Sequence, residues 1–465
     1  MKWLINIFFR TFTAILPVFI ISSLFSSCSD DDYVNAIPSN SIALVSLDLR
    51  KMAAEGTGNE VNNAKLLNSL LHVENAGNCG IDLQEKIYLF ESAEGNLGLV
   101  AKVKDNSDVE EWLEKLVNGG ICKNRTKRSD YQFAIMKDSW VIGFSDETFM
   151  MMGPVIVSQY AEVQQAMIKY MSQDEEQGIK PAPLYEKLDS MEYPLAIVAK
   201  ASALPQQMVV PFMIGAPKNA EPSQIMIAAG MTTGTDGLMQ INGEIYSLNE
   251  KINKELKEAY KNYRPISGGF IGNIESSSLF AAFMNVEGEK YLPMLRANSS
   301  AQVLLAGINT AIDMDNIIRS IDGDLFLASP GFEGSSMQMQ MGARLKKKDF
   351  MADVDYWKQS CPAGSKITNW EKGSFCYNSG DFNLYFGVSD NNVFYSGTTT
   401  ALAKGVLTSA SAPLPENIRN AIAGKRLCIM VNVEKLIGDN EEVRTALNLL
   451  VPLTGKVNTI LYTID

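Results

Sequence analysis

The same ordered set of short sequence patterns occurs twice in this chain of 465 residues. Residues 78–83 (NCGIDL) are matched by residues 309–314 (NTAIDM), and residues 108–112 (DVEEW) are matched by residues 353–357 (DVDYW). Self-similarity on this scale indicates that one structural unit is repeated along the chain. We therefore expect a duplicated body, in which each half must bury its own core.

Alternating apolar and polar residues in the matched segments predict the fold class. Residues 97–103 and 337–345 alternate with a period of two, which is typical of strands with one buried face. Hairpin turns are too frequent for a regular alternation of strands and helices. We predict an α+β fold of duplicated antiparallel sheets with helices mainly on one face. The halves are expected at residues 37–263 and 264–465, because Arg264-Pro265 breaks the pattern between them.

The second half is shorter than the first at its C-terminus. Residues 457–465 match residues 225–233, but only the first half continues into an alternating strand at 238–246 and a polar helix at 249–261. An unpaired last strand would leave backbone donors and acceptors open on a sheet edge. Three interpretations remain: its partner is elsewhere in the chain, its partner is another protein, or the strand is already paired on both sides.

The N-terminus has the features of a secretory signal peptide. Lys2 and Arg10 give a positive start, and residues 11–25 form an apolar stretch that is too short for a permanent membrane span. Small residues follow it. We therefore assign residues 1–27 to a signal peptide that is removed on export.

Phe25-Ser26-Ser27-Cys28 resembles the lipobox of bacterial lipoproteins, in which Cys28 would be diacylated and become the first residue of the mature chain. Ser29-Asp30-Asp31-Asp32 resembles the export signal that sends Bacteroides-type lipoproteins to the outer face of the outer membrane. We expect residues 28–36 to form an acidic tether between the anchor and the body. An ordinary secretory signal is the alternative to the lipobox, and a solvated tether without a sorting role is the alternative to the export signal. An anchor of this kind requires more than one acyl chain.

The remaining cysteines fit an exported protein, in which disulfides can persist. Cys361 and Cys376 flank a Gly-containing loop and are the candidate pair. A bridge closing this loop would contribute about 3 kcal/mol of stability. Cys79 with Cys122 is a second possible pair, and Cys428 lies in an apolar strand as a buried thiol.

The sequence contains no catalytic, metal or cofactor motif that we can assign. The chain has 1 histidine, His72, so it contains no two-histidine zinc site, and its net charge of −12 argues against sequence-independent binding to nucleic acid. No phosphate-binding loop is present. For the aspartates near residue 313 we expect turn and capping roles rather than a calcium loop, because Ile318 stands where the loop needs glycine.

The tryptophans are the candidates for aromatic contacts with a partner. Trp112 and Trp357 occupy matching repeat positions on expected helices next to apolar strands, so we expect them in the core. Trp140 follows a hairpin turn and is the better candidate for an exposed contact. Trp370 receives no role from the sequence.

The lipobox-like start, the acidic segment and the duplicated body resemble an uncharacterised family of Bacteroides-type lipoproteins. The resemblance implies export and anchoring to the outer membrane, on the cell surface or on the periplasmic face, but no activity. We expect a lipid-anchored, non-catalytic envelope protein that binds a protein or a glycan. The alternatives are a hydrolase that uses carboxylates on surface polymers, and a structural element of envelope assembly.

Overall fold

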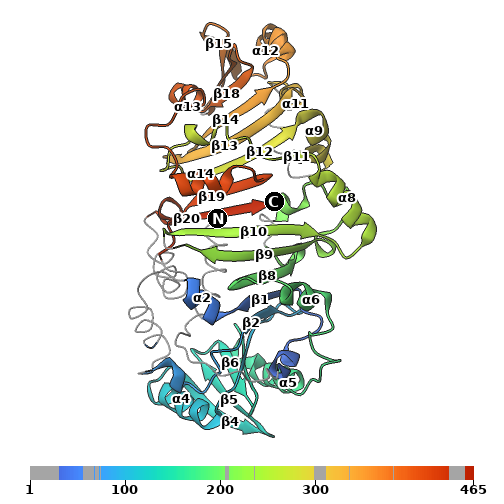
Figure 1. Ribbon diagram of the computed structural model, residues 1–465, viewed down its shortest axis with the longest axis vertical. Coiled ribbons are helices and arrows are strands. Elements are labelled where there is room, and N and C mark those ends of the chain that lie inside the picture. The colour runs from blue at the N-terminus through green and yellow to red at the C-terminus, as the bar shows by residue number, and fades with distance from the viewer. Residues whose placement is uncertain are drawn as a thin grey trace. The chain divides into compact units, whose positions relative to one another are not determined.

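The computed structural model describes residues 31–55, 68, 73, 75–204, 209–234, 236–297, 311–334, 336–380, 382–438 and 456–464 (Figure 1). Its architecture is α+β, as predicted: 20 strands are joined in one sheet, and helices pack on them. The expectation of separate duplicated sheets is not met, since a single sheet is assigned. The described residues fall into two compact units, one with the residues up to 204 and 226–239, the other with residues 209–225, 240–438 and 458–464.

The first unit contains an antiparallel sheet. In spatial order its strands are β4 (Cys122–Arg128), β5 (Tyr131–Met136), β6 (Trp140–Phe144), β7 (Thr148–Gly153), β3 (Leu97–Lys102), β2 (Ile87–Glu91), β1 (Ala43–Leu47), β8 (Leu195–Lys200) and β9 (Met226–Thr233). Its helical segments are η1 (Asp32–Ala36), α2 (Leu49–Glu55), η2 (Ala76–Asn78), α4 (Asn106–Asn118), η3 (Val157–Gln159), α5 (Tyr160–Met171), α6 (Pro183–Asp189) and η4 (Ala201–Ala203).

The second unit also contains an antiparallel arrangement of strands. In spatial order these are β15 (Ser365–Glu371), β16 (Ser374–Ser379), β17 (Phe382–Val388), β18 (Val393–Gly397), β14 (Ser336–Leu345), β13 (Ile321–Glu333), β12 (Phe280–Glu287), β19 (Leu427–Asn432), β20 (Thr459–Ile464) and β10 (Leu238–Tyr246), with β11 (Tyr263–Arg264) also paired to β12. Counted from β1 and from β12, the two units join their strands in the same order.

Helices lie along the strands of the second unit as well. They are η5 (Val210–Met213), η6 (Pro222–Gln224), α8 (Glu250–Tyr260), η7 (Ile271–Asn273), α9 (Gly288–Ala297), α11 (Met314–Arg319), η8 (Asp349–Asp353), α12 (Val354–Ser360), α13 (Thr400–Gly405), α14 (Glu416–Ile422) and α15 (Val433–Ile437). One core cluster of this unit joins Leu292, Ile317 and Trp357 from three helices to Phe386 and Phe394 of the sheet. This cluster fixes which sheet face those helices cover.

Helix α4 shows how the sequence sets the local structure of the first unit. The Asp105 side chain caps the helix by accepting hydrogen bonds from the backbone N–H groups of Ser107 and Asp108. Val109 and Trp112 face inward and are buried, as the helical period requires. Trp112 joins a core cluster that includes Ile142 of β6.

The other face of the same strands is covered by α5. A Cβ added at Gly143 of β6 would lie 2.9 Å from the Cε atom of Met167, so this glycine lets the helix approach the strand closely. Met167 and Phe133 are fully buried there. The sheet of the first unit is therefore buried on both faces at β5 and β6.

The last strand has partners on both sides. β20 pairs with β19 and with β10, and the Thr463 hydroxyl donates to the Asn242 Oδ1 atom of β10 at 2.7 Å. Because β10 lies far upstream, at residues 238–246, the interpretation of a partner elsewhere in the chain is confirmed, and the strand is paired on both sides. The interpretation of an open edge waiting for another protein is wrong, because β10 takes that position.

The folded body begins earlier than the sequence predicts. Residues 28–36 were expected to form an acidic tether, but Asp32–Ala36 form η1, in which Tyr33 to Ala36 are buried. The Tyr33 hydroxyl donates to the Lys86 carbonyl oxygen at 2.6 Å, and Asp32 lies 3.9 Å from the Lys180 ammonium group. The apolar side chains that follow Asp32 gain more by burial than by solvation, which shortens the tether.

The buried carboxylate of Asp324 anchors the loop that contains Ser267 and Gly269. Asp324 is 4% exposed. It accepts hydrogen bonds from the backbone N–H groups of Ser267 and Gly269 and from the Asn285 amide, at 2.9, 2.9 and 3.0 Å, and from the Ser267 hydroxyl at 2.6 Å. Four donors of this kind satisfy a buried charge. The expected capping role is confirmed at Asp313, which caps α11, whereas Asp324 stands inside β13 and anchors a loop instead.

The Asp324 network gives a stability prediction. Asp324→Ala leaves several donors without an acceptor, so we expect the free energy of unfolding to fall by about 3 kcal/mol or more. Asp322→Ala is the matched control: this carboxylate pairs with Arg264 at 2.8 Å but is 38% exposed, and its loss should cost under about 1 kcal/mol. Urea unfolding measures both, and equal losses would contradict an anchoring role for Asp324.

Candidate functional site

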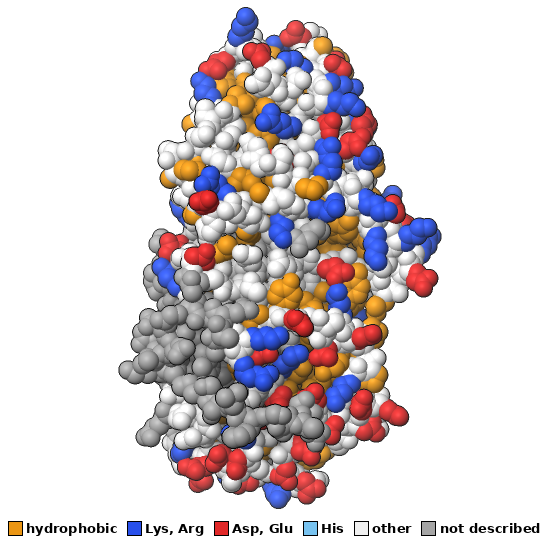
Figure 2. Space-filling model, viewed as in Figure 1, with side chains coloured by type: hydrophobic (Ala, Val, Ile, Leu, Met, Phe, Trp, Pro, Cys, Tyr) orange, Lys and Arg blue, Asp and Glu red, His pale blue; other side chains and the backbone are white. Residues whose placement is uncertain are grey.

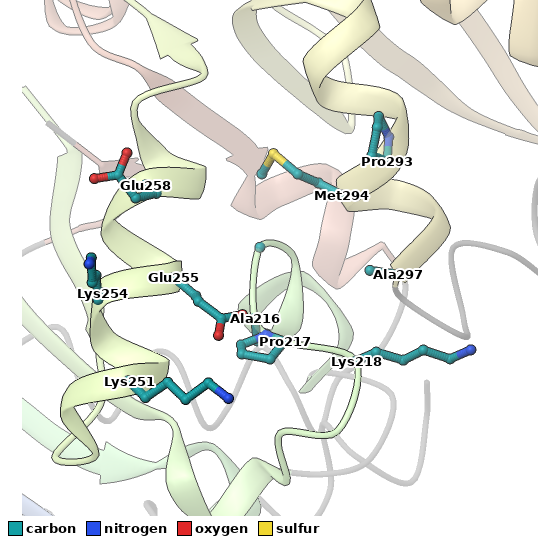
Figure 3. Close-up of a pocket in the computed structure, with 11 residues that line it drawn as sticks. Ala216, Pro217, Lys218, Lys251, Lys254, Glu255, Glu258, Pro293, Met294 and Ala297 are labelled. Atoms are coloured by element: carbon teal, nitrogen blue, oxygen red, sulfur yellow. The ribbon is translucent and has the colours of Figure 1, made fainter.

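A groove of about 690 Å³ opens on the second unit between α8, α9 and residues 215–218 (Figure 3). Apolar and charged side chains line it: Gly215, Ala216, Pro217, Lys218, Lys251, Lys254, Glu255, Glu258, Pro293, Met294 and Ala297. Concave sites with apolar walls and a few charged groups are the usual places for ligands. This groove is therefore the first site to test for chemistry.

Local structure explains the shape of the groove. Asn249 caps α8 by accepting from the backbone N–H groups of Lys251 and Ile252, and Ile252 and Leu256 anchor the helix by burial. Gly215 has a φ of +91°, and a Cβ there would lie 2.8 Å from Ala259 of α8. Glycine thus allows the 215–218 segment to run close beside the helix.

The charged groups of the groove do not form a catalytic pair. Figure 3 shows Glu255 pointing toward Pro217, whereas Glu258 points away on the other side of α8. Glu258 is bound to Lys261 at 2.6 Å, and both side chains are well exposed. Glycoside hydrolysis needs two carboxyl groups facing one bond, so this arrangement gives the hydrolase hypothesis no support.

Two carboxyl groups of the first unit have a raised pKa. Burial raises the pKa of Glu91, and burial also raises the pKa of Glu85, with Lys102 at 4.0 Å opposing the rise and Asp82 and Asp31 adding to it. Glu85 precedes β2 and Glu91 ends it, so the extended strand Ile87–Glu91, about 13 Å long, lies between them. They cannot act on one bond together.

The residues singled out by the sequence lie in different places. Cys28, Ser29, Asp30 and His72 are outside the described residues. Asp31 stands directly before η1, and its charge acts on Tyr33 and Glu85. Asp32 belongs to η1 itself. The predicted export signal therefore runs into the folded body.

The predicted bridge between Cys361 and Cys376 is not formed, and both thiols are free. Cys361 packs against the core cluster that holds Phe375 and Tyr377. Cys376 stands between these two residues in β16, so its side chain points to the opposite sheet face. The sheet separates the two sulfur atoms, and loop length alone did not reveal this. Cys79 and Cys122 share one core cluster and are also free thiols.

The tryptophan predictions have mixed outcomes. Trp112 and Trp357 are buried in the core, as expected. The prediction for Trp140, the better candidate for an exposed contact, is wrong: its side chain is 4% exposed and packs in the first unit's core. Trp370, to which we assign no role from its sequence context, is half-buried on β15.

Charge and metal-site geometry limit the chemistry of the described residues. On the face drawn in Figure 2, acidic and basic side chains are interspersed over the described surface, without a large area of one sign. Across the part of the chain that the structure describes, no three His, Cys, Asp or Glu side chains are grouped so as to hold a metal ion. None of the described helices combines the length and apolar character needed to cross a bilayer.

These features define an α+β protein with a charged surface groove and without an assigned reaction. The chain belongs to a family described as a domain of unknown function (DUF4836), whose model matches residues 33–421. The match begins at Tyr33, where the buried part of η1 begins.

The comparisons with curated proteins and with solved structures support no argument about function. No curated protein matches the chain. Crystal forms III and IV of TP0453 are similar over 36% and 37% of this chain and 65% and 66% of theirs, with 12% and 11% identity and TM-scores of 0.25 and 0.24. The chain thus spans about two thirds of TP0453.

The cysteine environments predict selective thiol reactivity. Burial raises the pKa of both Cys79 and Cys122 to about 11, so about one in a thousand of each is thiolate at pH 8. Cys376 and Cys428 are buried as well. We expect maleimide to label Cys361 first in the native protein, because it is the most exposed of the five described thiols.

Mass spectrometry of the labelled peptides checks this, with Cys361→Ser as the control that should lose the fast label. The buried thiols should react far more slowly than Cys361 in the native protein, and the slow rates of Cys79 and Cys122 should still be rising with pH at pH 9. A fast reaction at Cys79 at pH 7 would contradict the burial of that side chain.

Proposed function

We propose that this protein is a lipid-anchored lipoprotein of the outer membrane, exposed on the cell surface, with a body of two repeats that binds a partner without catalysis. One observation carries the anchoring: Phe25-Ser26-Ser27-Cys28 stands about four residues before Asp32, where the folded body starts. Four extended residues span about 13 Å. Such a short connection fits a body held directly at a membrane by acyl chains on Cys28.

Strand register supports the two repeats, which we place at residues 37–263 and 264–465. In the first unit Gly143 of β6 pairs with Met150 of β7, and in the second unit Gly387 of β17 pairs with Tyr395 of β18. Each glycine lies in the corresponding strand, and each is followed after one residue by a Ser-Asp turn. Duplication explains the shared strand order more simply than independent origin does.

The geometry of the groove supports binding rather than catalysis. Its two carboxylates point in different directions, and one is neutralised by Lys261. A spacing or assembly role for the body is not favoured by any particular contact. Binding is thus the function that the described surfaces support best.

Anchoring and surface exposure are tested in intact cells of the native host. The natural protein should incorporate labelled palmitate and be digested by external protease, whereas Cys28→Ala should lose the label and leave the membrane fraction. Replacing Ser29, Asp30 and Asp31 by Ala should keep the label but protect the protein from digestion. Asp32 is left unchanged, because it contributes to η1 and pairs with Lys180.

A double change of Glu175 and Glu176 to Ala is the matched control, since both side chains are exposed and the change removes two charges without touching the signal. It should be digested like the natural protein. Equal digestion of the Ser29–Asp31 variant would refute the export signal. Protection of every labelled form would place the anchored protein on the periplasmic face instead.

A further inference from the structure

The two units differ in what covers one face of their corresponding strands. In the first unit, Phe133 pairs with Gly143 and Ile135 pairs with Val141 across β5 and β6. These side chains are 0–4% exposed, and α5 covers them through Met167, which lies beside Gly143.

In the second unit the corresponding pairs have a different character. Ser374 pairs with Gly387, and Cys376 pairs with Tyr385, across β16 and β17. After β18 the chain forms α13, which is shorter than α5 and packs against β14, β17 and β18. Tyr385 remains half-buried. An apolar, covered surface in one unit thus corresponds to a polar, partly open surface in the other.

This open surface carries a defined set of side chains, which we call the Trp370 platform: Thr368, Trp370, Asn378, Asn383 and Tyr385. Direct cross-strand pairs place their side chains on one face, because Thr368 opposes Cys376 and Cys376 opposes Tyr385. The Trp370 ring meets the Tyr385 ring edge to face, with centroids 5.6 Å apart. The β15, β18 and α13 elements around it lie together at one end of Figure 1.

The platform combines aromatic rings with groups that both donate and accept hydrogen bonds. The Asn378 amide donates to the Asn383 Oδ1 atom at 2.8 Å and to the Gly380 carbonyl oxygen at 3.4 Å, which leaves lone pairs on both amide oxygens and the N–H groups of Asn383 for a ligand. The Trp370 indole N–H is buried and has no acceptor among the described residues. An unsatisfied buried donor of this kind requires an explanation, and a bound acceptor would supply one.

A weak ion pair places its ammonium group over the indole ring. The Lys404 ammonium is 5.3 Å from the centre of the Trp370 ring and 2.5 Å from the Glu371 carboxylate. These two charged side chains are 57% and 47% exposed, so little free energy holds them in place. A ligand can displace Lys404 and reach the ring.

We infer that the Trp370 platform binds a carbohydrate chain, which deepens the proposed binding function and rests on it. Sugar rings present C–H groups that pack on aromatic faces, and hydroxyl groups that pair with amides, hydroxyls and an indole N–H. A protein partner would need larger apolar anchors. Tyr356 and Phe382, the exposed aromatic side chains nearest in sequence, belong to α12 and to the opposite face of β17.

The test uses the full chain, purified in detergent from its native membranes. A glycan array of neutral glucose, mannose and N-acetylglucosamine oligomers, with uronate polymers added, identifies the ligand, and calorimetry then measures its Kd. Trp370→Ala should weaken binding at least tenfold, and Tyr385→Phe should weaken it severalfold. Tyr356→Ala, an aromatic change on a side chain that is 69% exposed, is the matched control and should leave the Kd unchanged.

Two further variants guard against simple unfolding. Trp370→Phe keeps a ring but removes the N–H, so it should bind more weakly than the natural protein and more tightly than Trp370→Ala. Lys404→Ala uncovers the ring and should bind at least as well as the natural protein. Near-ultraviolet circular dichroism shows that each variant is folded.

Absence of glycan binding by the natural protein at 1 mM, or an unchanged Kd in Trp370→Ala, overturns the inference. These outcomes are separable from those of the cell-surface test. A protein that binds glycans but is protected from external protease refutes surface exposure alone. A surface-exposed protein that binds no glycan refutes the platform alone.

Discussion

Each strand in this fold presents side chains to two faces, and each face must be either buried or polar. The constraint is strict because a one-residue shift in register moves every side chain of a strand to the other face. In the first unit both faces of β5 and β6 are covered, by α4 on one side and α5 on the other. In the second unit one face packs on α12, and the other has acquired polar and aromatic residues.

The same constraint explains which predictions from the sequence succeed. Strand β10 (Leu238–Tyr246) has the predicted bounds. Helix α8 extends over Glu250–Tyr260, within the predicted range, since Asn249 is a strong cap and Ile252 and Leu256 keep the helical period. Local pattern suffices where a single buried face decides the structure.

Predictions failed where the outcome depends on a partner distant in sequence. We predicted a tether at Tyr33, but its hydroxyl donates to the Lys86 carbonyl oxygen, which is 53 residues away in the sequence. A contact over this distance cannot be recognised from the local pattern. Cys361 and Cys376 looked like a pair because spacing does not reveal sheet faces. Trp140 follows a turn, as expected, but faces the core beside α4.

Trp370 could not have been found from alternation, because β15 contains an irregularity between Asn369 and Glu371 in its pairing with β16. A bulge of this kind redirects side chains at a sheet edge, and such irregularities are over-represented next to functional sites. In the first unit β4 has a comparable irregularity between Lys123 and Thr126, yet the strands beside it lie under α5. The irregularity alone therefore does not make a site. What differs in the second unit is the shorter helix after β18, α13 in place of α5, which leaves the surface of the proposed Trp370 platform partly open.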